Sequence, residues 1–138
     1  MSMQRSDFTF FHRLRVRWAE SDPQGIVYNG HYLTYFDVAV TEYWRALGLP
    51  YPSTVERFGL DLFVAKATVE YHAPAHYDDE LDIGVRVGRI GNSSMHFVLG
   101  IFRGEAHLAS GELIYVAAHP QTRQPQPVPQ AMRELLER

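Results

Sequence analysis

One segment in the first third of the chain combines helical spacing with many aromatic side chains. Its apolar positions recur three and four residues apart and are Tyr32, Tyr35, Phe36, Ala39, Val40, Tyr43 and Leu47. This period predicts an α-helix, for which Asn29 is the candidate N-cap and Gly48 the candidate stop. The polar side, made by Asp37, Thr41 and Arg45, is narrow. We therefore expect a helix that is buried on most of its sides by the rest of the chain.

The segments around this helix alternate with period two, which predicts half-buried strands. Ahead of it, residues 10–19 place Leu14, Val16 and Trp18 on one side and three arginines on the other. After a connection at 49–60, alternation returns at 62–74, 80–90, 93–103 and 105–119, where Gly111 suggests a bulge. Short links between these strands favour antiparallel neighbours. A strand, a helix and four strands predict an α+β fold, followed by a short helix near residues 130–138.

Composition narrows the possible functions. At 138 residues the chain is expected to form a single domain, 1–138. It has no cysteine, which excludes disulfides and thiolate metal sites. The formal charge of −3, with acids and bases interspersed, gives no support for binding nucleic acid. We see no apolar run of signal or membrane-spanning length, and we expect a cytoplasmic protein that acts on a small molecule.

A carboxylate lies a few residues before the predicted helix. Pro23 suits the second position of a turn that begins at Asp22, so turn chemistry alone can explain this aspartate. The start of a helix, however, carries unpaired N–H groups and stabilises an oxygen that gains negative charge. The N–H groups near Asn29, Gly30 and His31 are the candidates here. A carboxylate beside them can activate water or attack a carbonyl, which makes catalysis the alternative interpretation.

Two stretches of the chain resemble a known family. "SDPQGIVYNGHYLTYFDVA" (21–39) is similar to the segment that leads into the helix in the 4-hydroxybenzoyl-CoA thioesterase family of hotdog-fold proteins. The matching positions are Asp22, Pro23, Gly25, Ile26, Val27, Tyr28, Asn29 and Tyr32. Residues 69–102 resemble the family's second stretch, in which a Pro…Tyr-Asp-Asp-x-Leu turn precedes an Ile-Gly-x-Ser turn. The resemblance covers residues 12–117 in order.

The resemblance implies a hotdog fold, in which an antiparallel sheet of about five strands wraps around one long central helix. It also implies an acyl-CoA thioesterase that forms a homodimer or homotetramer and binds substrate at the dimer interface. Asp22 would be the nucleophile or general base. The Asn29 backbone N–H would be the lead oxyanion donor, with Gly30, His31 and Tyr28 beside it. Some bacterial relatives have histidine at the position of Asn29, so an imidazole at that point is not expected here.

Other residues are candidates with competing structural explanations. Asn92, Ser93, Ser94 and Arg89 resemble the family's turn near the pantetheine and nucleotide of CoA, although alone they predict a hairpin turn. Further arginines that suit CoA phosphates, or simply face solvent, are Arg86, Arg103 and Arg123. Two aromatic residues, Trp18 and Tyr28, suit either an acyl pocket or the core. Glu20 is expected to be a solvated residue at a strand end, or to hold a water. His72 and His76 flank Pro74 without a third ligand, so no metal is expected.

The sequence therefore predicts an acyl-CoA thioester hydrolase that releases a carboxylic acid and free CoA. It needs no cofactor or metal, because CoA is part of the substrate. The alternatives are a thioesterase for acyl carrier protein and a non-catalytic hotdog protein that binds acyl-CoA. Hydratase chemistry fits the motif around Asp22 poorly.

Overall fold

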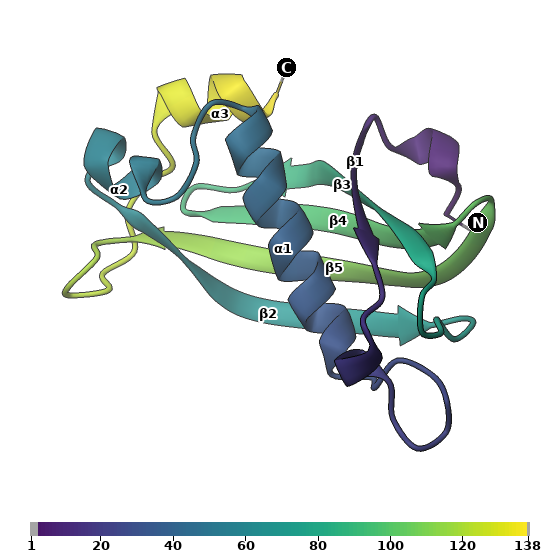
Figure 1. Cartoon of the computed structure of the whole chain (residues 1–138). Helices are drawn as coiled ribbons and strands as arrows, with labels where there is room; N and C mark the ends of the chain where they lie inside the picture. Colours follow the sequence, from purple (N-terminus) through teal and green to yellow (C-terminus); the bar gives the residue numbers. More distant parts are fainter. Residues whose placement is uncertain (1–2, 138) are drawn as a thin grey trace.

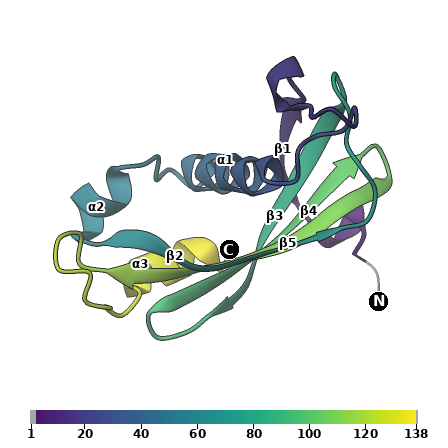
Figure 2. The same ribbon diagram turned by 90° about the horizontal axis from the view of Figure 1, so that it is seen from below.

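The computed structural model describes residues 3–137 and contains one antiparallel sheet that curves around a long helix (Figures 1 and 2). The helix is α1 (His31–Ala46). The strands are β1 (Phe10–Arg15), β2 (Asp61–Tyr71), β3 (Glu80–Ile90), β4 (Ser94–Arg103) and β5 (Ala106–Ala118), in the sheet order β1-β3-β4-β5-β2. The shorter elements are the 3-10 turns η1 (Arg5–Asp7) and η2 (Trp18–Glu20), and the helices α2 (Ser53–Phe58) and α3 (Gln130–Leu136). The predicted α+β fold of the hotdog type is confirmed.

The face of the sheet toward α1 forms the core. Alternate residues of the two central hairpin strands β3 and β4 point to this face and are fully buried, as the period-two pattern predicts. They are Leu81, Ile83, Val85, Met95, Phe97, Leu99 and Ile101. From α1, Phe36 and Ala39 reach the same core and expose no surface.

Close packing between α1 and the sheet depends on one glycine. A Cβ at Gly111 of β5 would lie 2.7 Å from the Cζ of Phe36 and 2.8 Å from the Thr68 carbonyl oxygen. The predicted bulge at Gly111 is wrong, because this residue pairs in register with Val69 and the irregularities lie elsewhere. Gly111 is needed because the Phe36 ring occupies the space of a side chain.

Fewer sides of helix α1 are buried than predicted. Leu33 and Val38 are 40% and 38% exposed, and Asp37 lies between them on the same open side. The helix lies across one face of the sheet, and among residues 3–137 no second layer covers its outer side (Figure 2). The expectation of a helix wrapped on most sides is therefore wrong for a single chain.

The outer face of the sheet is partly covered by the chain's own N-terminal segment. Phe102 of β4 is buried there, in edge-to-face contact with Phe8 and Phe11 at centroid distances of 6.0 and 6.3 Å. Phe102 is therefore buried within a single chain, by aromatic rings of its own N-terminal segment. Val64 on β2 stays about half exposed.

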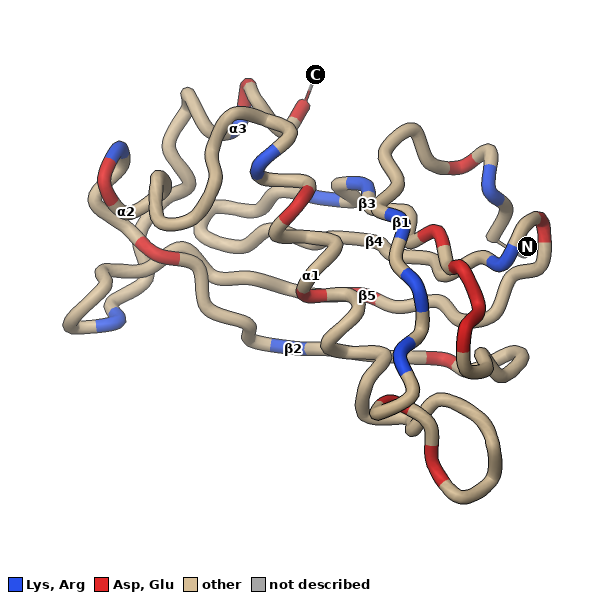
Figure 3. Tube along the Cα trace, in the orientation of Figure 1, with Lys and Arg blue, Asp and Glu red and all other residues tan. Residues whose placement is uncertain are grey.

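Charged side chains on the β1–β3 edge are paired. Figure 3 shows the basic residues of β1 beside an acidic run at the start of β3. Arg13 Nε donates to Asp82 Oδ1 at 2.8 Å, and Arg15 Nη2 lies 3.2 Å from Glu80 Oε2. These arginines therefore do not form a free basic stripe of the kind that nucleic acids require.

The ends of several elements differ from the prediction. The first strand ends at Arg15, and Trp18 lies in η2 with 74% of its surface exposed, so its alternation with Leu14 does not continue. Helix α1 has Gly30, not Asn29, as its N-cap, while Gly48 follows its C-terminus with φ +86° as expected. The short helix α2 interrupts the predicted connection at 49–60. The C-terminal helix is confirmed.

No helix among residues 3–137 is long and apolar enough to cross a membrane.

Candidate active site

The segment between η2 and α1 is a closed loop whose two ends meet. Ser21 and Val27 form an antiparallel bridge, and the Asp22 N–H donates to the Ile26 carbonyl at 2.8 Å. The Gly25 N–H returns to the Asp22 carbonyl at 2.9 Å, with Gly25 at φ +80°, a conformation that suits glycine. The loop thereby brings Asp22 back toward the start of α1.

Glu20 anchors the base of this loop. Its side chain is 6% exposed, and its Oε1 accepts hydrogen bonds from the Arg17 N–H at 2.8 Å and the Tyr35 hydroxyl at 2.9 Å. Burial acts to raise the pKa of Glu20, but the hydrogen bonds from Arg17 and Tyr35 outweigh it and hold the pKa below its usual value. The prediction of a solvated glutamate is wrong, and Glu20 is absent from the cavity wall described next.

Asp22 and Asn29 line one cavity of about 330 Å³. The Oδ1 of Asp22 accepts the Gln24 N–H at 2.8 Å, which is the side-chain-to-backbone bond of an Asx turn. The turn interpretation of this aspartate is therefore correct. In the part of the chain that the structure describes, Oδ2 has no hydrogen-bond donor. One carboxylate oxygen thus holds the turn, and the other is available to a molecule in the cavity.

The start of α1 supplies the second chemical feature of the cavity. The N–H groups of His31 and Tyr32 donate to the carbonyls of Tyr28 and Asn29, at 3.0 and 3.3 Å. Within residues 3–137, the N–H groups of Asn29 and Gly30 donate to no acceptor. Free N–H groups at a helix N-terminus stabilise negative charge on an oxygen. Asn29 is in the cavity wall, so its N–H remains the lead candidate for an oxyanion donor.

Two tyrosines complete the cavity wall. The Tyr32 hydroxyl accepts the Ala75 N–H at 3.1 Å, and burial raises the pKa of Tyr32. The Tyr71 hydroxyl donates to the Asn29 carbonyl at 2.9 Å. Tyr71 is the last residue of β2 and lies on the inner face of that strand, so the alternating pattern alone predicts a core residue and no part in the site. Its contact with Asn29 depends on the register of β2 in the sheet, which the local sequence pattern does not contain.

The remaining predicted contacts around the helix start lie beside the cavity and not in its wall. Tyr28 is half exposed and meets the His31 ring edge-to-face at 5.8 Å. A Cβ at Gly30 would lie 2.9 Å from the Tyr28 ring, so this ring covers the first turn closely. Trp18 packs against Tyr77 at 5.1 Å, outside the core.

The predicted CoA-binding turn lies at the far end of the sheet. Asn92 and Ser93 lie in the connection between β3 and β4, and Ser94 is the first residue of β4, whereas the cavity lies near the opposite end of β3. The 11 residues of β3 span about 33 Å at roughly 3.3 Å per residue. The Asn92 carbonyl accepts the Val128 N–H at 2.8 Å, so it holds the C-terminal segment. A single chain does not bring this turn to Asp22.

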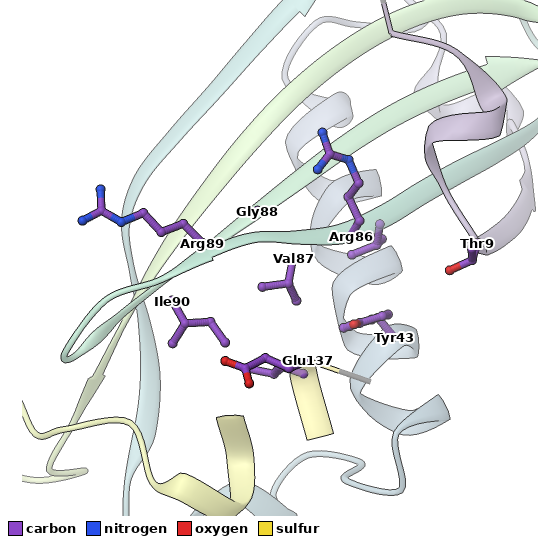
Figure 4. Close-up of a pocket in the computed structure, with 10 residues that line it drawn as sticks. Thr9, Tyr43, Arg86, Val87, Gly88, Arg89, Ile90 and Glu137 are labelled. Carbon is purple, nitrogen blue, oxygen red and sulfur yellow. The ribbon is translucent and has the colours of Figure 1, made fainter. Parts of the chain in front are cut away.

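A second cavity, of about 390 Å³, lies between β3, α1 and the C-terminal end of α3 (Figure 4). Arg86 and Arg89 lie in its wall and extend from β3 in different directions. It shares no residue with the cavity of Asp22. Arg103 is engaged elsewhere, because its Nη1 donates to Asp79 at 2.7 Å. Although it is smaller, the cavity of Asp22 is the candidate active site, since it combines a carboxylate with a helix N-terminus.

Among residues 3–137, no group of three His, Cys, Asp or Glu side chains is arranged to hold a metal ion. His76 instead lies 3.7 Å from Asp79, and His72 contacts Ser110 at 3.0 Å.

Comparisons with known proteins identify the family of this chain. The model of the thioesterase-like superfamily matches residues 16–136. The acyl-CoA thioester hydrolase YbgC of Escherichia coli O6:H1 is 30% identical over 86% of this chain and 89% of its own. The 1,4-dihydroxy-2-naphthoyl-CoA hydrolase of Synechococcus elongatus is 24% identical over 88% and 90%. The crystal structure of PA5185 from Pseudomonas aeruginosa superposes with a TM-score of 0.86 at 28% identity, covering 97% and 93%. The chain therefore belongs to the thioesterase-like superfamily.

Proposed function

We propose that this protein hydrolyses acyl-CoA thioesters to a carboxylic acid and free CoA. The observation that carries the proposal is a cavity lined by both Asp22 and Asn29, whose N–H donates to no acceptor within residues 3–137. The names of the relatives support the substrate class, since YbgC is an acyl-CoA thioester hydrolase.

The geometry favours a reaction in two steps. The thioester oxygen accepts the Asn29 N–H, and this bond strengthens as the oxygen becomes negative. Asp22 Oδ2 removes a proton from water, and the resulting hydroxide attacks the carbonyl carbon to form a tetrahedral oxyanion. This intermediate collapses, the carbon–sulfur bond breaks, and the CoA thiolate takes the proton back from Asp22. In the nucleophilic variant, Oδ2 attacks the carbon directly, the carbon–sulfur bond breaks, and the CoA thiolate leaves. Water then hydrolyses the resulting mixed anhydride to the carboxylic acid and the Asp22 carboxylate, and the proton released in this step goes to the thiolate. No metal or cofactor is needed in either route.

Acyl-CoA is a better candidate than an acyl carrier protein. An acidic carrier would need a free basic surface at the cavity mouth. The arginines near this end of the molecule are paired with carboxylates: Arg15 with Glu80, Arg17 with Glu20 and Arg103 with Asp79. Their charges are therefore largely balanced within the chain. A cytoplasmic location stays a prediction from the sequence.

A homodimer or homotetramer belongs to the same proposal. Strand β2 is an edge of the sheet, and its Val64 and Tyr71 are about half exposed. Antiparallel pairing of two β2 strands would place the Asp61 end of one copy beside the Tyr71 end of the other. A second copy could then bring its 92–94 turn toward this cavity. Analytical ultracentrifugation tests the assembly, and a monomer at micromolar concentration would contradict it.

The activity is tested by thiol release from a panel of acyl-CoAs, with wild type beside Asp22→Asn and Asp22→Ala. Asparagine keeps an oxygen for the Gln24 N–H and so preserves the turn, whereas alanine removes it. We expect both variants to lose roughly 10²- to 10⁴-fold in kcat, as is typical when an acid–base group is removed. Glu56→Gln on α2 is the control and should keep the wild-type rate.

Two other outcomes of this assay would contradict the proposal. Turnover that survives in Asp22→Asn would show that the charge of Asp22 is not used, and the proposed mechanism would be wrong. A wild type that binds acyl-CoA without releasing thiol would favour the non-catalytic binding protein.

A further inference from the structure

The start of α1 is fixed in an unusual way. Most helices are secured by a side chain at the N-cap that accepts a backbone N–H of the first turn. Here the N-cap is Gly30, which has no side chain, and no cap hydrogen bond is formed. The Asn29 carbonyl receives the Tyr32 N–H at 3.3 Å, which is long for such a bond. The Asn29–Gly30 peptide group is therefore held weakly by its own helix, whereas the preceding peptide group, which carries the Asn29 N–H, accepts the His31 N–H at 3.0 Å through the Tyr28 carbonyl.

A residue from a distant strand provides the stronger contact. The Tyr71 hydroxyl donates to the Asn29 carbonyl at 2.9 Å, across 42 positions of sequence. The Tyr71 ring packs edge-to-face on Tyr32 with 5.0 Å between centroids, and Tyr32 is itself buried. The Tyr71 ring is about half exposed, and its contact with the buried Tyr32 sets the position from which the phenol reaches Asn29.

We propose that Tyr71 is a positioning residue, which holds the Asn29–Gly30 peptide group and so fixes the backbone that carries the Asn29 and Gly30 N–H groups at the start of α1. This inference rests on the proposed thioesterase function. Tyr71 also lines the cavity, but a phenol has a single proton to donate, and the Asn29 carbonyl receives it. Tyr71 therefore acts through Asn29, without giving a hydrogen bond to the substrate.

The role has a specific kinetic consequence. An oxyanion donor works only when it points at the place where charge develops, so a small displacement affects the transition state more than substrate binding. Tyr71→Phe keeps the ring against Tyr32 and removes the hydroxyl alone. We expect kcat to fall by roughly ten-fold, which corresponds to one net hydrogen bond, while KM changes less than about two-fold.

The test combines this kinetic split with a spectroscopic signature. The Asn29 carbonyl and the Gly30 N–H belong to one peptide group, so loss of the phenol bond should shift the Gly30 amide signal in a ¹⁵N–¹H NMR spectrum of the free protein. Thr41→Val is the matched control. The Thr41 hydroxyl also donates to a backbone carbonyl, that of Asp37 at 2.9 Å, but it lies about three turns further along α1. It should alter neither kcat nor the Gly30 signal.

Three results would overturn the proposal. A rise in KM at constant kcat would mean that Tyr71 binds substrate directly. Unchanged kinetics would mean that Asn29 is positioned without it. An unmoved Gly30 signal would mean that the bond is absent in solution. If wild type shows no turnover, the thioesterase function fails, and the NMR shift still decides whether Tyr71 fixes Asn29. A melting curve for each variant separates these outcomes from unfolding.

Discussion

The bond between Tyr35 and Glu20 should account for much of the stability of the loop that carries Asp22. Both side chains are almost fully buried, at 3% and 6% exposure, and the hydroxyl lies 2.9 Å from Oε1. A buried hydrogen bond to a charged group contributes about 1.5–3 kcal/mol. Tyr35→Phe removes this bond while the Arg17 N–H still satisfies Oε1, so the free energy of unfolding should fall by about that amount.

A double-mutant cycle isolates the pair. Glu20→Ala leaves the Tyr35 hydroxyl buried without an acceptor and should destabilise the protein further, whereas Tyr35→Phe in that background should have little effect. The coupling from urea unfolding at pH 7 should therefore be about 1.5–3 kcal/mol. The pKa of Glu20 is lowered in the folded state, so its contribution is complete above its unfolded pKa, about 4.3, and is lost as pH falls through the lower folded value.

A coupling energy between Tyr35 and Glu20 below about 0.5 kcal/mol at pH 7 would refute this expectation. A coupling energy that grows as the pH is lowered would refute it as well. Arg17→Ala is the internal comparison. Its side chain is 79% exposed, so its ion pair with Glu20 is screened by water and should matter less than the Tyr35 bond. If Arg17→Ala is the more destabilising change, burial does not set the strength of this network.

Two further predictions concern stability. Gly111→Ala forces a methyl group against Phe36 and should lower the free energy of unfolding by about 1–3 kcal/mol. Gly88→Ala is the comparison and should cost less, because its methyl group would meet no atom closer than the Val98 Cγ2 at 3.1 Å. Equal losses in urea unfolding would count against the packing argument. Hydrogen bonds from Arg13 hold the pKa of Asp82 below its usual value, despite burial. Stability should therefore decrease as pH falls below about 4, and a urea series in which Asp82→Asn shows the same acid loss as wild type would contradict this assignment.

The elements of the fold follow from local patterns, but their ends do not. Helical spacing identifies α1 and strict alternation identifies β3 and β4, because each period reports which side faces the core. Where the alternation stops is not visible in the pattern. Leu14 and Trp18 lie in phase, yet the chain turns into η2 between them and exposes Trp18. The open side of α1, with Leu33, was missed for a related reason: apolar content does not say whether one chain or two supply the cover.

In the candidate site, too, local features could be predicted from the sequence and contacts between distant segments could not. Asp22 and Asn29 are seven positions apart in a loop whose turn residues are local, so their proximity could be predicted. Tyr71 could not be assigned to the site, because its contact depends on where β2 lies in the sheet and on the register that sets its inner face. The 92–94 turn shows the reverse case. Its family resemblance suggested a shared site, but strand length separates it from Asp22 within one chain.

The two interpretations of Asp22 are not in competition. A carboxylate has two oxygens, and the Asx turn engages only Oδ1, through the Gln24 N–H at 2.8 Å. That bond fixes the plane of the carboxylate and so directs Oδ2 without a further side chain. The loop itself is tied at Glu20 and by the Val27 N–H, which donates to the Ala75 carbonyl at 2.8 Å. Turn chemistry therefore supplies the preorganisation that a base or nucleophile needs. It follows that asparagine, which can keep the turn bond but not the charge, separates the two roles more cleanly than alanine.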